Sequence, residues 1–264
     1  MIKIINRKFA GIISMCSFCI CQLASTAFAN NDKAYFQQQV EYKISVTLDD
    51  KKHQLSGDAE MKYINHSPDI LTEIYFHLWP NAYKDRTSAL CKQLVSEGNM
   101  QLYFAPDSLR GFMDELDFKV NNKPVTVVYD SLNADICRLI LNQPLKPEDS
   151  ITITTPFRVK IPDAKFSRLG RIGDSYMISQ WYPKPAVYDK FGWHPMPYLS
   201  QGEFYSEYGS FDVRITLPEN YVVAASGYLQ TPSEIEFIKN KIVESSSVAT
   251  YSSDNYFPIS SDKF

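Results

Sequence analysis

Metal-binding residues are scarce in this sequence. The four histidines are His53, His66, His77 and His194. They are too dispersed to form a His-x-x-x-His pair, so the helical zinc motif His-Glu-x-x-His is absent. After residue 29 the remaining cysteines are Cys91 and Cys137, which supply no Cys-x-x-Cys pair of ligands. We therefore expect the histidines to be ordinary strand or loop residues, and we expect no metal site in this chain.

Motifs for other common chemistries are also missing. The sequence contains no Gly-x-Ser-x-Gly nucleophile elbow and no glycine-rich loop with the spacing that cradles phosphate. The closest glycine-rich stretch, at residues 167–173, fits neither phosphate motif and predicts an exposed turn. The acids Asp114, Glu115 and Asp117 are typical of a solvated edge, because acid–base catalysis needs carboxylates in differently tuned environments. We therefore expect no catalytic residue here.

Runs of positive charge are absent as well. The 264 residues have a formal net charge of −3 and contain no basic run, whereas a nucleic-acid-binding protein needs a basic patch to neutralise phosphates. Long apolar stretches are also lacking after the N-terminal region, and a transmembrane helix needs about 20 such residues. These absences argue against nucleic acid as a partner and against a transmembrane anchor.

The first 29 residues have the features of a signal peptide. Three basic residues precede an apolar run at residues 9–23, and Ala-Phe-Ala at residues 27–29 is a small-x-small cleavage pattern. A membrane anchor is the alternative, but about 15 interrupted apolar residues fall short of a span. We expect residues 1–29 to be removed on export, residues 30–264 to form one domain, and the product to be periplasmic or extracellular. Removal lowers the net charge to −6.

The two cysteines that remain after export allow two interpretations. In an oxidising compartment Cys91 and Cys137 could form a disulfide, provided that their Cα atoms lie close enough. Cys91, however, shares one helical face with Leu90, Leu94 and Val95. This pattern is equally consistent with a buried free thiol.

Alternation of apolar and polar residues predicts a mostly β protein. Residues 40–48 alternate strictly, and the alternation resumes at residues 55–63 after a turn. This pattern predicts a long antiparallel hairpin with one wet face. Many short strands separated by turn clusters indicate a β-sandwich. The further strand-like runs lie at residues 73–78, 116–120, 125–129, 137–141, 151–155 and 211–217.

Two short helices interrupt this pattern. The first is predicted at about residues 88–97. The second begins near Ser233, where Ser233 and Glu236 could form a capping box and the isoleucines that follow keep helical spacing. Both helices are expected to decorate a sheet protein.

Aromatic and proline residues are concentrated in one stretch, QWYPKPAVYDKFGWHPMPY, at residues 180–198. It contains six aromatic rings and four prolines. Because prolines remove backbone donors and fix φ, it predicts a stiff irregular segment and not a strand in the middle of a sheet. Its rings, which include Trp181, Tyr188, Trp193 and Tyr198, can bury large apolar areas.

Two blocks of sequence carry a family resemblance. The first is FHLWPNAYKDRTSALCKQL at residues 76–94, and the second covers residues 167–227 with an uncommon order of rings and prolines. Both resemble the N-terminal β domain of M1-family zinc metallopeptidases, which are aminopeptidase N-like, in the secreted bacterial branch. The resemblance covers essentially the whole chain after residue 29.

This resemblance implies a large, saddle-like, mostly antiparallel β-sandwich domain that precedes a thermolysin-like catalytic domain. In the family the catalytic domain holds zinc through His-Glu-x-x-His and a downstream Glu, and a Gly-x-Met-Glu-Asn-type loop binds the amino terminus of the substrate. The sequence ends at Phe264, before either motif. We therefore expect a domain truncated at its C-terminal end, with no cofactor of its own, and zinc in the implied full-length enzyme.

The resemblance also implies a substrate-binding position. In many members a Ser/Thr-Gln-x-Gln/Glu run at the end of a strand reaches the active site, where its last residue helps to bind the free amino group. The matching run here is residues 179–182, in which Gln180 fits the pattern and Tyr182 replaces the Gln or Glu. A phenol lacks the carboxylate charge that pairs best with an ammonium group. Packing within a strand is the other interpretation of both residues.

We expect the chain to be the non-catalytic N-terminal domain of an exported M1-type aminopeptidase. Its partners would be the missing catalytic domain, in cis or in trans, and the peptide substrate of the full-length enzyme. Segment 180–198 would form part of the docking surface and one wall of the cleft, and would leave an apolar patch on the isolated chain. The alternative is a secreted, non-enzymatic β-sandwich that binds carbohydrate or protein through an exposed line of rings, including Trp181, Trp193 and Tyr198.

Overall fold

A computed structural model describes residues 35–246 of the chain. The chain divides into two compact units at residue 36, and every helix and strand described below belongs to the unit that begins at Gln37. The predicted signal peptide at residues 1–29 lies outside the described residues. Within the described range, no helix combines the length and the apolar character that crossing a membrane requires.

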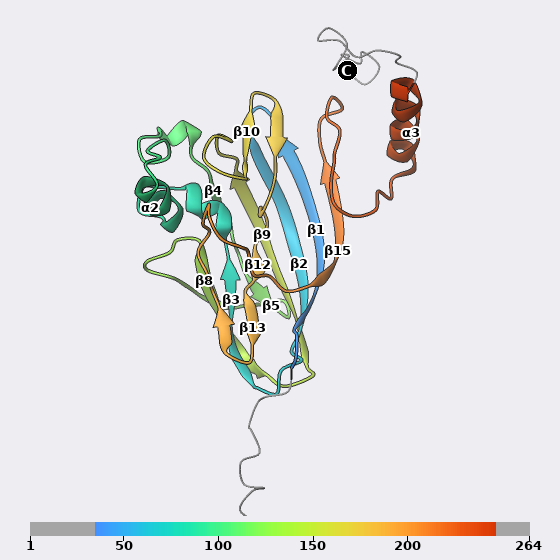
Figure 1. Ribbon diagram of the computed structural model, residues 1–264. Helices are drawn as coiled ribbons and strands as arrows, with labels where there is room; N and C mark the ends of the chain where they lie inside the picture. Colours follow the sequence, from blue (N-terminus) through green and yellow to red (C-terminus); the bar gives the residue numbers. More distant parts are fainter. Residues whose placement is uncertain (1–34, 247–264) are drawn as a thin grey trace, which may run out of the picture. The chain divides into compact units, whose positions relative to one another are not determined.

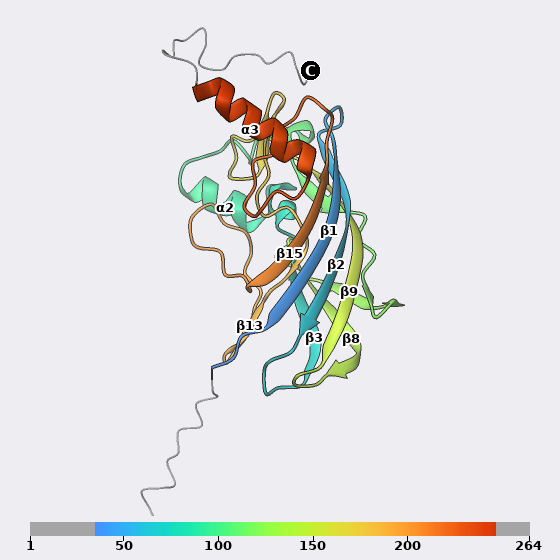
Figure 2. The ribbon, with the colours of Figure 1, turned by 90° about the vertical axis from the view of Figure 1, so that its right-hand side faces the viewer.

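Most of the unit is built on one seven-stranded sheet (Figure 1). Its strands follow the order β15-β1-β2-β9-β5-β6, and β4 pairs separately with β9. The strands are β1 (Gln39–Asp49), β2 (Gln54–Ile64), β4 (Phe112–Asp114), β5 (Lys119–Val120), β6 (Lys123–Pro124), β9 (Ser150–Lys160) and β15 (Gly209–Thr216). The long strands β1, β2 and β9 run side by side and curve together, as Figure 2 shows.

A second sheet has four strands in the order β12-β3-β8-β7. These strands are β3 (Leu71–His77), β7 (Thr126–Tyr129), β8 (Ile136–Leu145) and β12 (Lys184–Pro185). Two small hairpins complete the strands, β10 (Gly170–Ile172) with β11 (Ser175–Met177), and β13 (Val187–Asp189) with β14 (Gly192–His194). The mostly β fold class predicted from the sequence is confirmed.

The predicted long hairpin is β1–β2. Its strands pair antiparallel without interruption from Gln39↔Ile64 to Asp49↔Gln54. The Asp49 carboxylate accepts hydrogen bonds from the backbone N–H groups of Lys51 and Lys52, which holds the turn. Every second residue of β1 is buried, so one face of the hairpin is packed and the other is wet, as the alternation predicts.

The described sheets are mostly antiparallel, as expected, with one parallel pair. Among the named strands of the described residues, β1 and β15 form the one parallel pair, from Val40↔Gly209 to Thr47↔Thr216. After β9, residues 161–208 lead the chain back to the beginning of β1, so β15 runs parallel to β1. A Cβ atom at Gly209 would lie 2.2 Å from the carbonyl oxygen of Val40, which only glycine avoids.

Inward side chains of both sheets share one hydrophobic core. Phe76 of β3 contacts Phe118 edge-on, with ring centroids 5.0 Å apart. The inner face of β2 contributes Met61 and Tyr63, and β9 contributes Phe157, all essentially inaccessible to solvent. The core therefore forms where the alternating apolar faces of the two sheets meet.

The two predicted helices are present, with one correction. The first is α2 (Ala89–Ser96), and the side chain of Ser88 caps it by accepting the N–H of Cys91. The second is α3 (Pro232–Ser246), whose first turn begins one residue earlier than predicted. The N–H of Ile235 bonds to the carbonyl of Thr231, so Thr231 precedes the helix and Pro232 opens it. The 3₁₀ turns are η1 (Trp79–Tyr83) and η2 (Asp107–Leu109).

Removal of the Phe76 ring from the core should destabilise the fold severely. Phe76→Ala is expected to lower the free energy of unfolding by about 3–5 kcal/mol, because it removes a fully buried ring and leaves a cavity against Phe118. Urea denaturation followed by circular dichroism measures the change. The control Phe191→Ala removes a ring that is 80% exposed and should shift stability by less than about 0.5 kcal/mol. Equal losses in both variants would contradict this account of the core.

Candidate functional site

Segment 180–198 packs against its own domain. It is a chain of short elements, β12, β13 and β14 joined by irregular turns, as its prolines predict. In this segment Phe191 is strongly exposed, whereas Trp181, Tyr182, Tyr188 and Trp193 are partly buried against the core and Tyr198 is fully buried. Most of these rings are therefore partly covered by the two sheets of the same unit, and the predicted docking surface stays a prediction.

The first part of the segment packs against the buried face of the seven-stranded sheet. Trp181 lies 5.9 Å, centroid to centroid, from the ring of Phe157 on β9. Tyr182 meets Tyr42 of β1 edge-on at 5.6 Å and also contacts Phe211 of β15. Burial raises the pKa of the Tyr182 phenol to about 12, so this group is neutral at physiological pH.

The hairpin β13–β14 carries the next two rings. Trp193 contacts Tyr75 of β3 at 5.8 Å and Tyr63 of β2 at 6.4 Å, so it links the two sheets. The hydroxyl of Tyr188 donates to the carboxylate of Asp69 at 2.8 Å. Both rings are thereby held by side chains of the same unit.

Tyr198 is the centre of a buried hydroxyl network. Its hydroxyl accepts from the hydroxyl of Tyr83 at 3.0 Å and lies 3.1 Å from the hydroxyl of Ser167. Its backbone N–H donates to Oδ2 of Asp135 at 2.6 Å. Burial raises the pKa of the Asp135 carboxyl to about 6, although the N–H of Tyr198 opposes this shift. This network joins Tyr198 to Tyr83 of η1. Trp79, at the other end of η1, also donates to the carbonyl of Met196.

A buried ammonium group lies at the centre of the candidate site. Lys184 of β12 is 4% exposed. Its Nζ donates to Oε1 of Gln180 and to Oγ of Ser206, and it lies 3.9 Å above the ring of Trp79. Burial lowers the pKa of Lys184 to about 7, whereas the two acceptors and the electron-rich face of the indole favour the charged form.

The position of Gln180 follows from this lysine. Gln180 has a φ of 54°, in the left-handed region that non-glycine residues rarely adopt. Its amide oxygen accepts the bond from Lys184, so in this structure that oxygen is occupied within the domain. The structure therefore gives Gln180 a positioning role toward Lys184 and leaves its predicted contact with substrate untested.

His77 is the second buried titratable group. It pairs with Lys184 across β3 and β12, and its ring stacks on Trp79 with centroids 4.5 Å apart. Within the described residues neither ring nitrogen has a hydrogen-bond partner of good geometry. Burial, followed by the charge of Lys184, lowers the pKa of His77 to about 3, so the ring is neutral at physiological pH.

Glu207 is the third perturbed group. Burial raises the pKa of its carboxyl to about 7, while the backbone N–H of Tyr188 and the side chain of Gln37 act in the opposite direction. The nearby pair of His194 and Asp189 is closer to solvent, with Nε2 to Oδ1 at 2.8 Å. Lys184 and His77 thus meet at the ring of Trp79, whereas Glu207 lies near Tyr188, His194 and Asp189.

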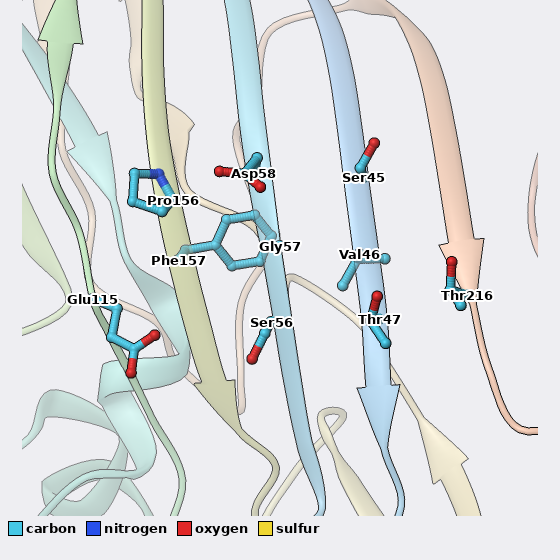
Figure 3. Close-up of a pocket in the computed structure, with 10 residues that line it drawn as sticks. All are labelled: Ser45, Val46, Thr47, Ser56, Gly57, Asp58, Glu115, Pro156, Phe157 and Thr216. Atoms are coloured by element: carbon cyan, nitrogen blue, oxygen red, sulfur yellow. The ribbon is translucent and has the colours of Figure 1, made fainter.

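A shallow groove crosses the opposite, polar face of the seven-stranded sheet (Figure 3). It has a volume of about 330 Å³. The side chains of Asp58 and Glu115 lie on either side of Pro156, and Glu115 is also 3.2 Å from Arg158. Serine and threonine side chains contribute four hydroxyl groups to the groove, so much of its lining is polar. The lining residues are Ser45, Val46, Thr47, Ser56, Gly57, Asp58, Glu115, Pro156, Phe157 and Thr216.

The described residues do not fit a zinc ion. No group of three or more His, Cys, Asp or Glu side chains converges anywhere in residues 35–246. His53 bonds to the hydroxyl of Tyr176 at 2.7 Å, and His66 pairs with Glu148 at 2.9 Å. The zinc that the family resemblance implies would therefore need ligands from outside this part of the chain.

Cys91 and Cys137 are both free and buried. Cys91 lies on α2, where it packs into the core as its helical face predicts, and Cys137 lies on β8. Burial raises the pKa of the Cys137 thiol to about 12. Of the two interpretations left open by the sequence, the structure shows unpaired thiols and not the disulfide.

Sequence reasoning missed these three perturbed groups. Lys184 lies between two prolines, His77 lies in an apolar strand, and Glu207 lies among tyrosines. The available signal was a single charged or titratable residue inside a run of apolar or aromatic residues, which is unusual for the interior of a protein. Sequence spacing alone could not reveal that His77 and Lys184 meet at the ring of Trp79.

Comparisons with known proteins give structural matches alone. No protein-family model and no curated protein matches the sequence. An M1 zinc metallopeptidase from Deinococcus radiodurans matches 75% of this chain and 36% of its own, with 16% identity and a TM-score of 0.39. Leukotriene A4 hydrolase from Saccharomyces cerevisiae matches 52% of this chain and 18% of its own, with 9% identity and a TM-score of 0.27. The chain thus spans about a third of the first protein and about a fifth of the second.

The buried lysine should make stability depend on pH. In the folded chain Lys184 loses its proton near pH 7, whereas in the unfolded chain it keeps the proton up to its ordinary pKa of 10.5. The unfolded state then binds more protons, so the free energy of unfolding attributable to Lys184 rises from pH 7 upward. At about 1.4 kcal/mol per pH unit, the rise between pH 7 and 9 is about 2–3 kcal/mol.

Urea denaturation of wild type and Lys184→Met at pH 7, 8 and 9 measures this rise. The variant should lack it, while Lys190→Met, which changes an exposed lysine of the β13–β14 turn, should retain it. The same pH dependence in wild type and Lys184→Met would show that Lys184 does not titrate in this range.

Proposed function

We propose that this chain is the non-catalytic N-terminal domain of an exported M1-type zinc aminopeptidase. The observation that carries the proposal is the packing of the two sequence blocks that resemble the family. Residues 76–94 and 167–227 are separated by more than 70 residues, yet they form one aromatic and polar junction. Tyr83 bonds to Tyr198, Trp79 bonds to the carbonyl of Met196, and Lys184 lies over the Trp79 ring.

The contacts at this junction offer a physical reason why the two blocks occur together in one sequence. Most rings of the second block pack against the core, and several contact residues of the first block, so the order of rings and prolines serves this packing. The packing supports the proposal that both blocks belong to one structural unit of the family type. The mostly β fold is the one that the M1 N-terminal domain implies.

In the proposed enzyme the chain docks against a catalytic domain that supplies the zinc ligands, the general base and the substrate amine loop. Tyr182 would face the peptide cleft at the position of the family's amine-binding residue. Its ring is fixed by Tyr42 and Phe211, so its hydroxyl would be a positioned neutral hydrogen-bonding group. The export of the protein follows from the signal-peptide pattern of residues 1–29.

No observation favours the carbohydrate-binding alternative. A sugar platform needs rings that form an exposed flat line, whereas Trp181 and Trp193 pack against the core and Tyr198 is fully buried. Phe191 is strongly exposed, but one ring does not form a flat line of rings.

The gene beyond codon 264 tests the proposal. Sequencing should find a continuation, in frame or shifted in frame, that encodes His-Glu-x-x-His and a Gly-x-Met-Glu-Asn-type loop. The extended polypeptide should then hydrolyse an aminoacyl p-nitroanilide in a chelator-sensitive manner, and the 264-residue chain alone should not. A downstream sequence with neither motif, or chelator-sensitive turnover by the chain alone, would contradict the proposal.

The cleft role of Tyr182 can be tested separately in the extended enzyme. Tyr182→Phe keeps the ring contacts with Tyr42 and Phe211 but removes the hydroxyl. We expect it to raise KM for peptides about 2- to 13-fold, which corresponds to the loss of one hydrogen bond of about 0.5–1.5 kcal/mol, with an unchanged thermal midpoint. Tyr208→Phe, at a ring that is 82% exposed, is the control. An unchanged KM would assign Tyr182 to packing alone.

A further inference from the structure

Strand β15 has an open outer edge. It forms the border of the seven-stranded sheet, and among the described residues β1 is the strand that pairs with it (Figures 1 and 2). All eight of its residues, 209–216, are solvent-exposed. An open strand edge presents unpaired N–H and C=O groups, which another strand can use.

One face of β15 is apolar and uncovered. Phe211, Val213 and Ile215 lie on the same face as the buried side chains of β1, since Phe211 pairs with Tyr42 and stacks on its ring at 4.4 Å. Their exposed fractions are 50%, 39% and 39%. Asp212 and Arg214 point to the other, polar face, beside Lys43 and Ser45 of β1.

The usual protection of an edge strand is missing. Natural edges are commonly blocked by proline, by lysine or by a β-bulge. The sequence of β15, GSFDVRIT, contains neither residue, and its register with β1 is continuous over all eight pairs. β15 is therefore suited to accept a further strand.

The sequence of β15 is complementary to itself in antiparallel orientation. When two copies pair about Val213, Asp212 lies opposite Arg214 of the partner subunit, and Arg214 lies opposite Asp212 of the partner subunit. On the other face Phe211 lies opposite Ile215 of the partner subunit, and the two Val213 side chains meet. Opposite charges and apolar pairs that face each other directly stabilise a sheet.

We propose that two copies of this chain pair through β15, antiparallel and with Val213 at the twofold axis. The pairing joins the two seven-stranded sheets into one continuous sheet. It satisfies both open edges at once, because a twofold axis places the same strand on both sides of the interface. A pairing shifted by one position would place apolar side chains on the polar face. A pairing centred on residue 212 or 214 would place Asp212 opposite Asp212 or Arg214 opposite Arg214, so the charges favour the register centred on Val213. This inference does not rest on the proposed aminopeptidase role.

Charge reversal tests the register. Sedimentation velocity of the purified chain should show a concentration-dependent dimer. Asp212→Arg and Arg214→Asp should each raise the dimer dissociation constant about tenfold or more, because each places like charges opposite one another at two symmetric positions. The double variant Asp212→Arg/Arg214→Asp should restore the wild-type value. Asp174→Arg, the same substitution in the exposed turn between β10 and β11, should leave it unchanged.

Cysteine cross-linking tests the axis. Val213→Cys should form a disulfide-linked dimer on mild oxidation, because its Cβ atom would lie about 5 Å from that of its symmetry mate. Ile215→Cys is the matched control, since the two Ile215 positions would lie about 13 Å apart along the strands, beyond disulfide reach. The native thiols Cys91 and Cys137 are buried and should not contribute.

The outcomes separate the alternatives. A dimer that both single reversals weaken, that the double reversal restores and that Val213→Cys traps would support the proposal. A chain that stays monomeric over the concentrations of the experiment would overturn it, and would indicate that another part of the same polypeptide occupies the edge. A dimer unaffected by the charge reversals, or one trapped by Ile215→Cys in preference to Val213→Cys, would overturn it in favour of a different interface. Circular dichroism of each variant confirms that the fold is retained.

Discussion

The requirement that β1, β2 and β9 each bury one face determines the arrangement of the rest of the structure. These strands alternate apolar and polar side chains over their whole length, so they must expose one face and cover the other. The second sheet covers part of the inner face, and segment 180–198 covers the margins with aromatic rings. The outer face keeps its serines, threonines and charges in water, where they line the groove of Figure 3.

Segment 180–198 places a charged residue, as well as aromatic rings, in the interior of the unit. Lys184 lies between two prolines on β12, the edge strand of the second sheet, where it pairs with His77 and its side chain lies over the ring of Trp79. Burying an ammonium group is unfavourable unless its donors are satisfied, and Gln180 and Ser206 provide the acceptors. The unusual φ of Gln180 accompanies this contact, so local strain and a buried charge occur at the same place.

The way in which the inner face of the sheet is covered also accounts for the two surfaces to which we assign a function, at Tyr182 and at the edge of β15. Tyr182 is held between β1 and β15, where the covered part of the sheet ends. Beyond it the apolar face of β15 continues without a cover in the described residues. Tyr182, for which we propose a role in a substrate cleft, and the open edge of β15 are therefore neighbouring features of one sheet margin, and we propose different partners for them.

The sequence by itself determined the local elements. Alternation predicted β1 and β2, strand-like runs predicted β3, β5, β7, β8, β9 and β15, and helical spacing predicted α2. Prolines predicted that segment 180–198 would be irregular. Each of these features depends on neighbouring residues, whereas the short strands β4, β6 and β10 to β14 were not predicted. It did not show that β15 returns parallel to β1, that the rings of residues 180–198 face inward, or that the cysteines lie apart as free thiols. It also missed that His77 and Lys184 meet at the ring of Trp79. Those outcomes depend on contacts between residues far apart in the chain, and their energies are decided by burial, which exists only once the sheets have packed.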